Sequence, residues 1–139
     1  MKVITIEGDK NAGKTTLVRN VLRRLVSDGA EVVFYEAGGY LYPDFHAVVI
    51  WRARKITLCS IGDSITYIRE GIKRAKENSS DILLNTRTLT VEEEKYKQSL
   101  PTDCDLRSVS VAPPKDENTE AFIKQNQVAL ESIMEMLSE

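Results

Sequence analysis

The sequence predicts a three-layer α/β/α sandwich with a mostly parallel sheet and one antiparallel hairpin. Its length of 139 residues suits a single domain, 1–139. Short apolar runs alternate with amphipathic helical stretches along most of the chain, as in a parallel sheet covered by helices on both faces. Two β-rich runs, 47–51 and 56–61, are separated by only four residues. That gap is too short for a helix, so the two runs are predicted to form the antiparallel hairpin.

The first predicted strand, residues 3–6, runs directly into the pattern G-x-x-x-x-G-K-T. Between a strand and a helix this pattern is typical of a phosphate-binding loop. Its glycines let the loop curl, so that backbone N–H groups and the start of the helix face a phosphate. We expect Lys14 to face solvent without ligand and to reach the β- and γ-phosphates, and Thr15 to bind Mg²⁺. The predicted nucleotide-binding residues of this segment are Gly8, Asp9, Lys10, Asn11, Ala12, Gly13, Lys14, Thr15 and Thr16.

A helix over 14–28 follows, with its apolar residues at helical spacing and Gly29 placed to end it. The next strand is predicted over 31–37, with Val32, Val33, Phe34 and Tyr35 as its core. Strand, helix and strand together form a βαβ unit, whose crossover is expected to be right-handed.

The first 40 residues resemble the opening of thymidylate kinases. The shared motifs are Thr5-Ile6-Glu7-Gly8, Ala12-Gly13-Lys14-Thr15-Thr16 and Gly38-Gly39. The middle block, a strand ending in Gly62-Asp63, a helix and a strand ending in Thr86-Arg87-Thr88, resembles small P-loop NTPases of prokaryotes and phages. These resemblances imply the P-loop NTPase fold and a stand-alone nucleotide-binding domain. The arginine that would hold an acceptor phosphate in thymidylate kinases is absent before Gly38, and their D-R motif and arginine-rich lid are absent too.

Two acids at the ends of apolar strands are candidates for orienting Mg²⁺. Asp63 follows the run 56–61, which is where P-loop proteins place such an aspartate, and Glu36 is the reserve candidate. Asp63 or Ser64 also suits the N-cap of the next helix, predicted over 64–78. The loop 38–45, which follows the strand predicted over 31–37, carries three aromatic residues and one acid. Its aromatic residues either stack on a base and close over a substrate or cover the edge of the sheet.

The short apolar run 82–84 is predicted to be a central strand that brings Arg87 beside the phosphate loop. A guanidinium matches phosphate oxygens, so Arg87 is a candidate catalytic residue with Lys14 and Asp63; the alternative is a surface arginine. Residues 89–105 form either a lid or a surface helix, with a capping box at 90–93. After a last strand over 106–112, Pro114 and Lys115 are candidates for contacting the base, and a final helix is predicted over 118–137.

Composition and charge limit the classes of function that are expected of the chain. A net charge of −2 argues against general nucleic-acid binding, and no apolar run reaches the roughly 20 residues that span a bilayer. Two cysteines fit a reducing compartment, so a cytoplasmic location is expected. The ligand is expected to be Mg-ATP rather than GTP, because no N-K-x-D sequence occurs. The chain is predicted to hydrolyse the nucleotide or to transfer its γ-phosphate to a small nucleotide-like acceptor. The alternative is a nucleotide-gated interaction module with little turnover and a protein partner that the sequence does not specify.

Overall fold

The computed structural model describes residues 1–37, 44–113 and 119–139, which form a six-stranded sheet with four helices. The elements are β1 (Lys2–Gly8), α1 (Lys14–Ser27), β2 (Glu31–Ala37), β3 (Phe45–Trp51), β4 (Arg54–Cys59), α2 (Ile65–Glu77), β5 (Ile82–Thr88), α3 (Glu93–Ser99), β6 (Asp105–Ser110) and α4 (Thr119–Ser138).

The strand order across the sheet is β2-β3-β4-β5-β1-β6. Strands β4, β5, β1 and β6 run parallel, whereas β2, β3 and β4 pair antiparallel. The predicted hairpin of β3 and β4 is confirmed, but the expectation of only one antiparallel pair is wrong, because β2 adds a second. The predicted βαβ unit also does not pair its own strands: β2 runs in the direction of β1, but β3, β4 and β5 lie between them.

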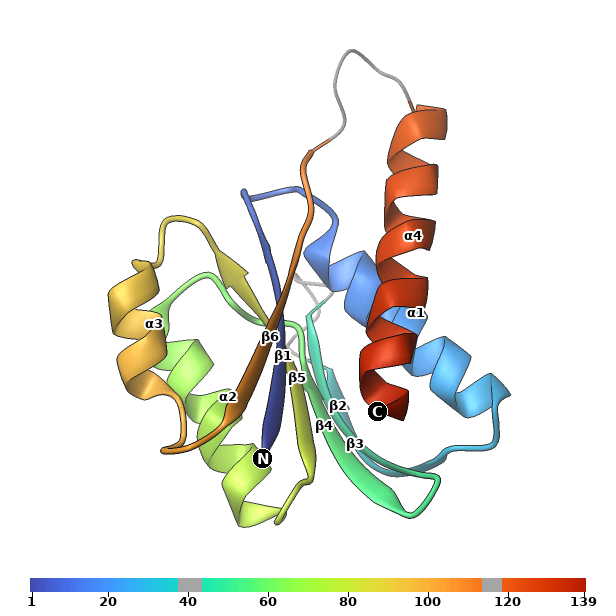
Figure 1. The fold of residues 1–139 in the computed structure, drawn as a ribbon, viewed down its shortest axis with the longest axis vertical. Coiled ribbons are helices and arrows are strands. Elements are labelled where there is room, and N and C mark those ends of the chain that lie inside the picture. Colours follow the sequence, from blue (N-terminus) through green and yellow to red (C-terminus); the bar gives the residue numbers. More distant parts are fainter. Residues whose placement is uncertain (38–43, 114–118) are drawn as a thin grey trace.

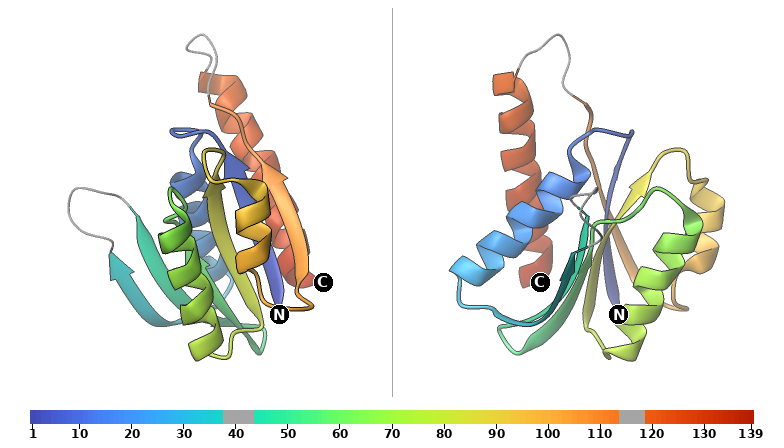
Figure 2. Two further views of the ribbon diagram at one scale, coloured as in Figure 1. Left: turned by 90° about the vertical axis from the view of Figure 1, so that its left-hand side faces the viewer. Right: turned by 180° about the vertical axis from the view of Figure 1, so that it is seen from behind.

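Helices cover both faces of the sheet, with α1 and α4 on one and α2 and α3 on the other (Figures 1 and 2). Each face has its own apolar core. Ile4 and Ile6 of β1 pack toward α1 and α4, whereas Val3 packs toward α2 and α3. This division follows from the alternation of side chains along a strand. The α/β class predicted from the alternating pattern therefore agrees with the structure.

The prediction that β2 contributes core residues is wrong. Val32, Val33, Phe34 and Tyr35 have 41–52% of their surface exposed, because β2 is an edge strand that pairs only with β3 among the described strands. The pairing of β2 with β3 is also shifted between Val32 and Phe34, as expected for a bulge at a sheet edge. By contrast, every residue of the central strand β5 is buried.

The predicted N-terminal cap of α2 is confirmed, whereas that of α3 is wrong. Ser64 is the N-cap of α2 and its side chain accepts a hydrogen bond from Tyr67 N, as expected. The capping box proposed at 90–93 is wrong, because α3 has Glu92 as its N-cap with no side-chain cap. Thr90 instead lies in the turn that links β5 to α3. Cys59 and Cys104 are both free thiols.

Gly62 is expected to be essential for the connection between β4 and α2. Its carbonyl accepts a hydrogen bond from Thr88 N (2.9 Å), and a Cβ placed on it would lie 2.2 Å from Thr86 O. Gly62→Ala should therefore lower the free energy of unfolding by about 3 kcal/mol, measured by urea denaturation. Gly29→Ala is the matched control: its φ is +92° with no atom within 4 Å, so only about 1 kcal/mol of backbone strain is expected. Equal losses in the two variants would contradict the prediction.

Candidate functional site

A cleft of about 760 Å³ lies where β1 and β5 end and α1 begins. Its volume is in the range of small-molecule binding sites. It is lined by Lys10, Asn11, Gly13, Lys14, Thr15, Thr16, Asp44, Ser60, Ile61, Asp63, Tyr67, Thr86 and Phe122. The structure thus brings much of the predicted phosphate-binding loop together with Asp63. Of the other predicted loop residues, Gly8 and Asp9 contribute backbone carbonyls, and Ala12 is fully buried.

Lys14 is held across the loop by two backbone carbonyls. Its Nζ donates to Gly8 O (2.9 Å) and to Asp9 O (2.7 Å). Burial lowers the pKa of Lys14, against the opposite effect of Asp63, Asp9 and Asp44. The expectation that this side chain faces solvent without ligand is wrong, because only 7% of Lys14 is exposed. The ammonium is instead directed by the curled loop toward the interior of the cleft.

The two glycines of the motif are needed for close packing. Gly13 precedes α1 with φ +85°, and a Cβ on it would lie 2.7 Å from Cζ of Phe122. A Cβ on Gly8 would lie 2.6 Å from Val111 O. The loop is therefore pressed between the end of β6 and the first turn of α4. A side chain at Gly8 would push the loop away from a backbone carbonyl, whereas a side chain at Gly13 would displace the Phe122 ring and strain a backbone with positive φ.

Asp44 is a cleft residue that the sequence analysis did not single out. Its Oδ1 accepts hydrogen bonds from Thr15 Oγ1 (2.8 Å) and Ser60 Oγ (3.1 Å). Ser60 is itself fixed by Phe45 N, which donates to its Oγ (2.8 Å). The topology explains the placement: β3 is antiparallel to β4, so the residue before β3 meets the residue after β4 at one edge of the sheet. The acid just before the run 45–51 was the available signal.

Asp63 also lies in the cleft, and its Oδ1 accepts a hydrogen bond from Thr88 Oγ1 (2.6 Å). Thr15, Asp44 and Asp63 offer oxygen ligands, the type that Mg²⁺ prefers. No group of three or more His, Cys, Asp or Glu residues able to hold a metal occurs in 1–37, 44–113 and 119–139. Mg²⁺ is commonly bound by one or two carboxylates, with waters and substrate phosphates completing its shell, so the donor set of this cleft fits Mg²⁺.

Two predicted site residues lie elsewhere. Arg87 donates to Val91 O (2.7 Å), pairs with Glu7 Oε1 (3.3 Å), and lies over the ring of Tyr96. Neighbouring Thr86 lines the cleft, and successive side chains of a strand point to opposite faces. Arg87 therefore faces α3 instead of the phosphate loop, which corrects the sequence-based placement. The surface alternative is wrong as well, because Arg87 is buried.

Glu36, the reserve metal candidate, lines a smaller neighbouring pocket and not the cleft that contains Thr15. There its Oε1 lies 3.7 Å from Arg74 Nη2.

Pro114 and Lys115, the predicted base contacts, lie outside the described residues, as does most of the aromatic loop 38–45. Phe122 is the base-side candidate that the structure adds, because it lines the cleft beside Gly13. In the sequence, Phe122 is one apolar residue of the helix predicted over 118–137, with no signal for a role in the site.

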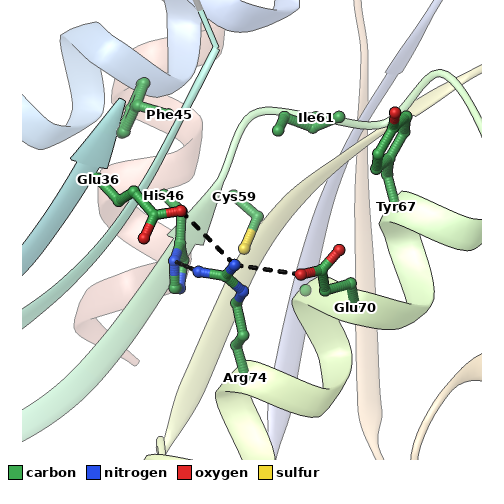
Figure 3. A pocket seen from close by; sticks show the side chains of 9 residues that line it. Glu36, Phe45, His46, Cys59, Ile61, Tyr67, Glu70 and Arg74 are labelled. Atoms are coloured by element: carbon green, nitrogen blue, oxygen red, sulfur yellow. Dashed lines mark hydrogen bonds and ion pairs between the residues drawn. The ribbon is translucent and has the colours of Figure 1, made fainter. Parts of the chain in front are cut away.

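The neighbouring pocket, called the side pocket below, has a volume of about 60 Å³. Figure 3 shows Arg74 at its centre, with Glu36, His46 and Glu70 directed toward the guanidinium. Arg74 Nη2 lies 3.1 Å from Glu70 Oε1, and Nη1 is hydrogen-bonded to His46 Nδ1. Ile61 and Tyr67 line both the side pocket and the cleft, so the two spaces are adjacent.

His46 should make the stability of the protein depend on pH. Burial lowers its pKa from the usual 6.5, and the charge of Arg74 lowers it further, against Glu36 and Glu70. Below about pH 6.5 the unfolded chain therefore binds a proton that the folded chain does not, so the free energy of unfolding falls as the pH drops. Urea denaturation of wild type and His46→Gln at pH 5.5 to 7.5 should show a shallower slope for the variant. Identical slopes would contradict the prediction.

Comparison of the chain with protein-family models, with curated proteins and with solved structures gave no match. No helix in the described part of the chain is long and apolar enough to cross a membrane. The case for a function therefore depends on the fold and on the geometry of the cleft: a sheet edge where a G-x-x-x-x-G-K-T loop, two acids and an aromatic ring meet. These features define the class of site, a candidate phosphate-binding cleft of an α/β domain.

Proposed function

We propose that the chain binds a magnesium-nucleoside triphosphate, ATP before GTP, in this cleft and transfers its γ-phosphate to water or to a small acceptor. The observation that supports the proposal most directly is the arrangement of two neighbouring loop residues. Lys14 is held by Gly8 O and Asp9 O, while Thr15 binds Asp44 in the same cleft. A cation and a hydroxyl paired with an acid are the groups that a metal-bound triphosphate requires.

Each group has a chemical task in this proposal. The loop between β1 and α1 offers its N–H groups and the positive end of the helix to the phosphates. Lys14 exchanges its two carbonyl partners for phosphate oxygens, which its lowered pKa does not prevent, because the nearby acids and the phosphates favour the charged form. Thr15 and Asp44 hold Mg²⁺, with Asp63 as the second acid. The ion, when bound, neutralises charge on the transferring phosphoryl group.

The base is proposed to lie beside Phe122, since this ring borders the cleft next to Gly13. An aromatic side chain stacks on any purine, so Phe122 contributes affinity without distinguishing ATP from GTP. The preference for ATP and the cytoplasmic location come from the sequence alone and stay part of the proposal.

Isothermal titration calorimetry tests the binding step. Mg-ATP, Mg-GTP and AMP are titrated into the full chain, and phosphate release is measured in parallel. Saturable heat is expected for Mg-ATP, weaker binding for Mg-GTP and the weakest for AMP, because AMP lacks the phosphates that meet Lys14. Absence of binding for every triphosphate would refute the proposal.

One observation favours the alternative of a nucleotide-gated interaction module. Among the described residues that line the cleft there is no arginine, and Arg87 is engaged by Glu7 and Val91. An arginine at the transferring phosphoryl group raises turnover by about 10³-fold or more, so its absence from this lining favours slow hydrolysis. Tight Mg-ATP binding with no phosphate release or transfer would support the module.

A further inference from the structure

We propose that the side pocket binds the phosphoryl acceptor, and that this acceptor presents an uncharged hydroxyl-bearing end and not a phosphate. The inference rests on the proposed function, because it names the acceptor class of the same site. The first support is position. Ile61 and Tyr67 form a wall common to the side pocket and the cleft, so a group in the side pocket lies next to whatever occupies the cleft.

The charge of the side pocket disfavours an anion. Glu36 and Glu70 both line it, and Arg74 is the single cation in its described lining. The guanidinium already pairs with both carboxylates, at 3.7 Å and 3.1 Å. A phosphate or carboxylate placed here would have to compete with two acids for one arginine. The carboxylates, with side chains more than half exposed, instead offer acceptor oxygens to a hydroxyl donor.

His46 contributes a neutral imidazole, and no second cation, to the side pocket. A guanidinium has no acceptor atom, so the hydrogen bond between Arg74 and His46 Nδ1 requires Nδ1 to be the unprotonated nitrogen. The proton of the neutral ring is then on Nε2, which has no hydrogen-bond partner among the described residues. His46 is 8% exposed, so this N–H is a buried donor without a partner. Since Nε2 is itself enclosed, the groups that an occupant meets are the two carboxylates, and a hydroxyl is the neutral group that donates to them.

The size of the side pocket limits what it admits. Its volume of about 60 Å³ is less than a tenth of the volume of the cleft, about 760 Å³. Phe45, Cys59 and Gly71 form its apolar lining, and a Cβ on Gly71 would lie 3.1 Å from Cys59 Sγ. The pocket therefore takes only the hydroxyl-bearing end of a molecule, with the remainder outside it.

The reaction that follows is a balanced phosphoryl transfer. The hydroxyl oxygen of the acceptor forms a bond to the γ-phosphorus, and the bond from that phosphorus to the bridging oxygen of ADP breaks. ADP leaves with the electron pair, and the hydroxyl proton passes through a carboxylate of the pocket to solvent. The products are ADP and a phosphate monoester.

The test uses matched pairs of acceptors with radiolabelled Mg-ATP and the full chain: glycerol and glycerol 3-phosphate, ribose and ribose 5-phosphate, thymidine and its 5′-monophosphate. ATP binding is measured separately by calorimetry. We expect at least one neutral member to accept phosphate ten-fold or more faster than its phosphorylated counterpart. Preference for the phosphorylated members, or no transfer to any acceptor while ATP binds, would overturn this inference and leave nucleotide binding intact. Absence of ATP binding would instead refute the proposed function, and the inference with it.

Variants of Glu70 separate acceptor binding from folding. Glu70→Gln removes one negative charge at constant shape, so it should raise the KM for the neutral acceptor about ten-fold, leave ATP affinity unchanged and narrow the preference against phosphorylated acceptors. Glu77→Gln is the matched control, because Glu77 lies on the same helix, pairs with Lys73 and does not line the side pocket. Equal KM values in the two variants would contradict a role for Glu70 in acceptor binding.

Discussion

Lys14→Ala is expected to lower nucleotide-dependent phosphate release or transfer by about 10³-fold, which corresponds to about 4 kcal/mol of transition-state stabilisation. The ammonium is placed by Gly8 O and Asp9 O inside the cleft, and no other described residue offers a cation that is as buried there. Steady-state assays at saturating Mg-ATP give the rate, and calorimetry gives the affinity, which should fall as well.

Stability must be followed in the same variant. Removal of Lys14 takes one hydrogen bond from each of two loop carbonyls, but Gly8 O still accepts from Leu89 N (3.2 Å) and Asp9 O from Ala12 N (3.1 Å). The expected loss in the free energy of unfolding is therefore only about 1 kcal/mol. Lys14→Met keeps the apolar part of the side chain and isolates the loss of charge. Lys97→Ala is the control, since Lys97 is exposed on α3 and pairs only with Glu93 among the described contacts. A folded Lys14→Met protein with wild-type rate and affinity would exclude Lys14 from phosphate binding.

The sequence was sufficient for those elements whose pattern depends on local spacing. The helices α1 and α2, the hairpin of β3 and β4, and the buried strand β5 lie where apolar periodicity predicted them. The placement of the loop between β1 and α1 at the cleft was predictable for the same reason, because its glycines and Lys14 are close together in the chain. The prediction that Asp63 lies at this edge is confirmed, because Asp63 follows β4 and the carboxyl ends of the parallel strands lie together there.

The errors arose where lateral position in the sheet or the face of a strand decides the outcome. Val32 and Phe34 are apolar, as residues of a core strand are, but β2 lies at the edge of the sheet and both side chains stay exposed. Arg87 is one residue from Thr86, and this single step in the alternation places it against α3 instead of the cleft. Asp44 was missed because only the pairing of β3 with β4 brings it to Thr15.

Asp44→Asn is expected to lower Mg²⁺-dependent turnover by about 10²-fold and to raise the Mg²⁺ concentration needed for half-maximal rate. Asp44 Oδ1 is bonded to Thr15 Oγ1 at 2.8 Å and to Ser60 Oγ at 3.1 Å, so this carboxylate is held beside the hydroxyl proposed to bind the metal. Asparagine preserves the size and one carbonyl oxygen but loses the negative charge that attracts Mg²⁺. The measurement is the rate of phosphate release or transfer as a function of Mg²⁺ at fixed ATP.

Asp63→Asn, measured beside it, decides which acid orients the metal. Asp63 is bonded to Thr88 Oγ1 at 2.6 Å and is not in a described hydrogen bond with Thr15, so we expect its variant to lower the rate with a smaller change in Mg²⁺ requirement. Asp103→Asn is the control, because Asp103 is exposed, does not line the cleft, and has φ +61°, which asparagine tolerates. A wild-type Mg²⁺ profile for Asp44→Asn together with a shifted profile for Asp63→Asn would assign the metal to Asp63, as the sequence predicted. Unchanged profiles in both would remove these acids from the metal site.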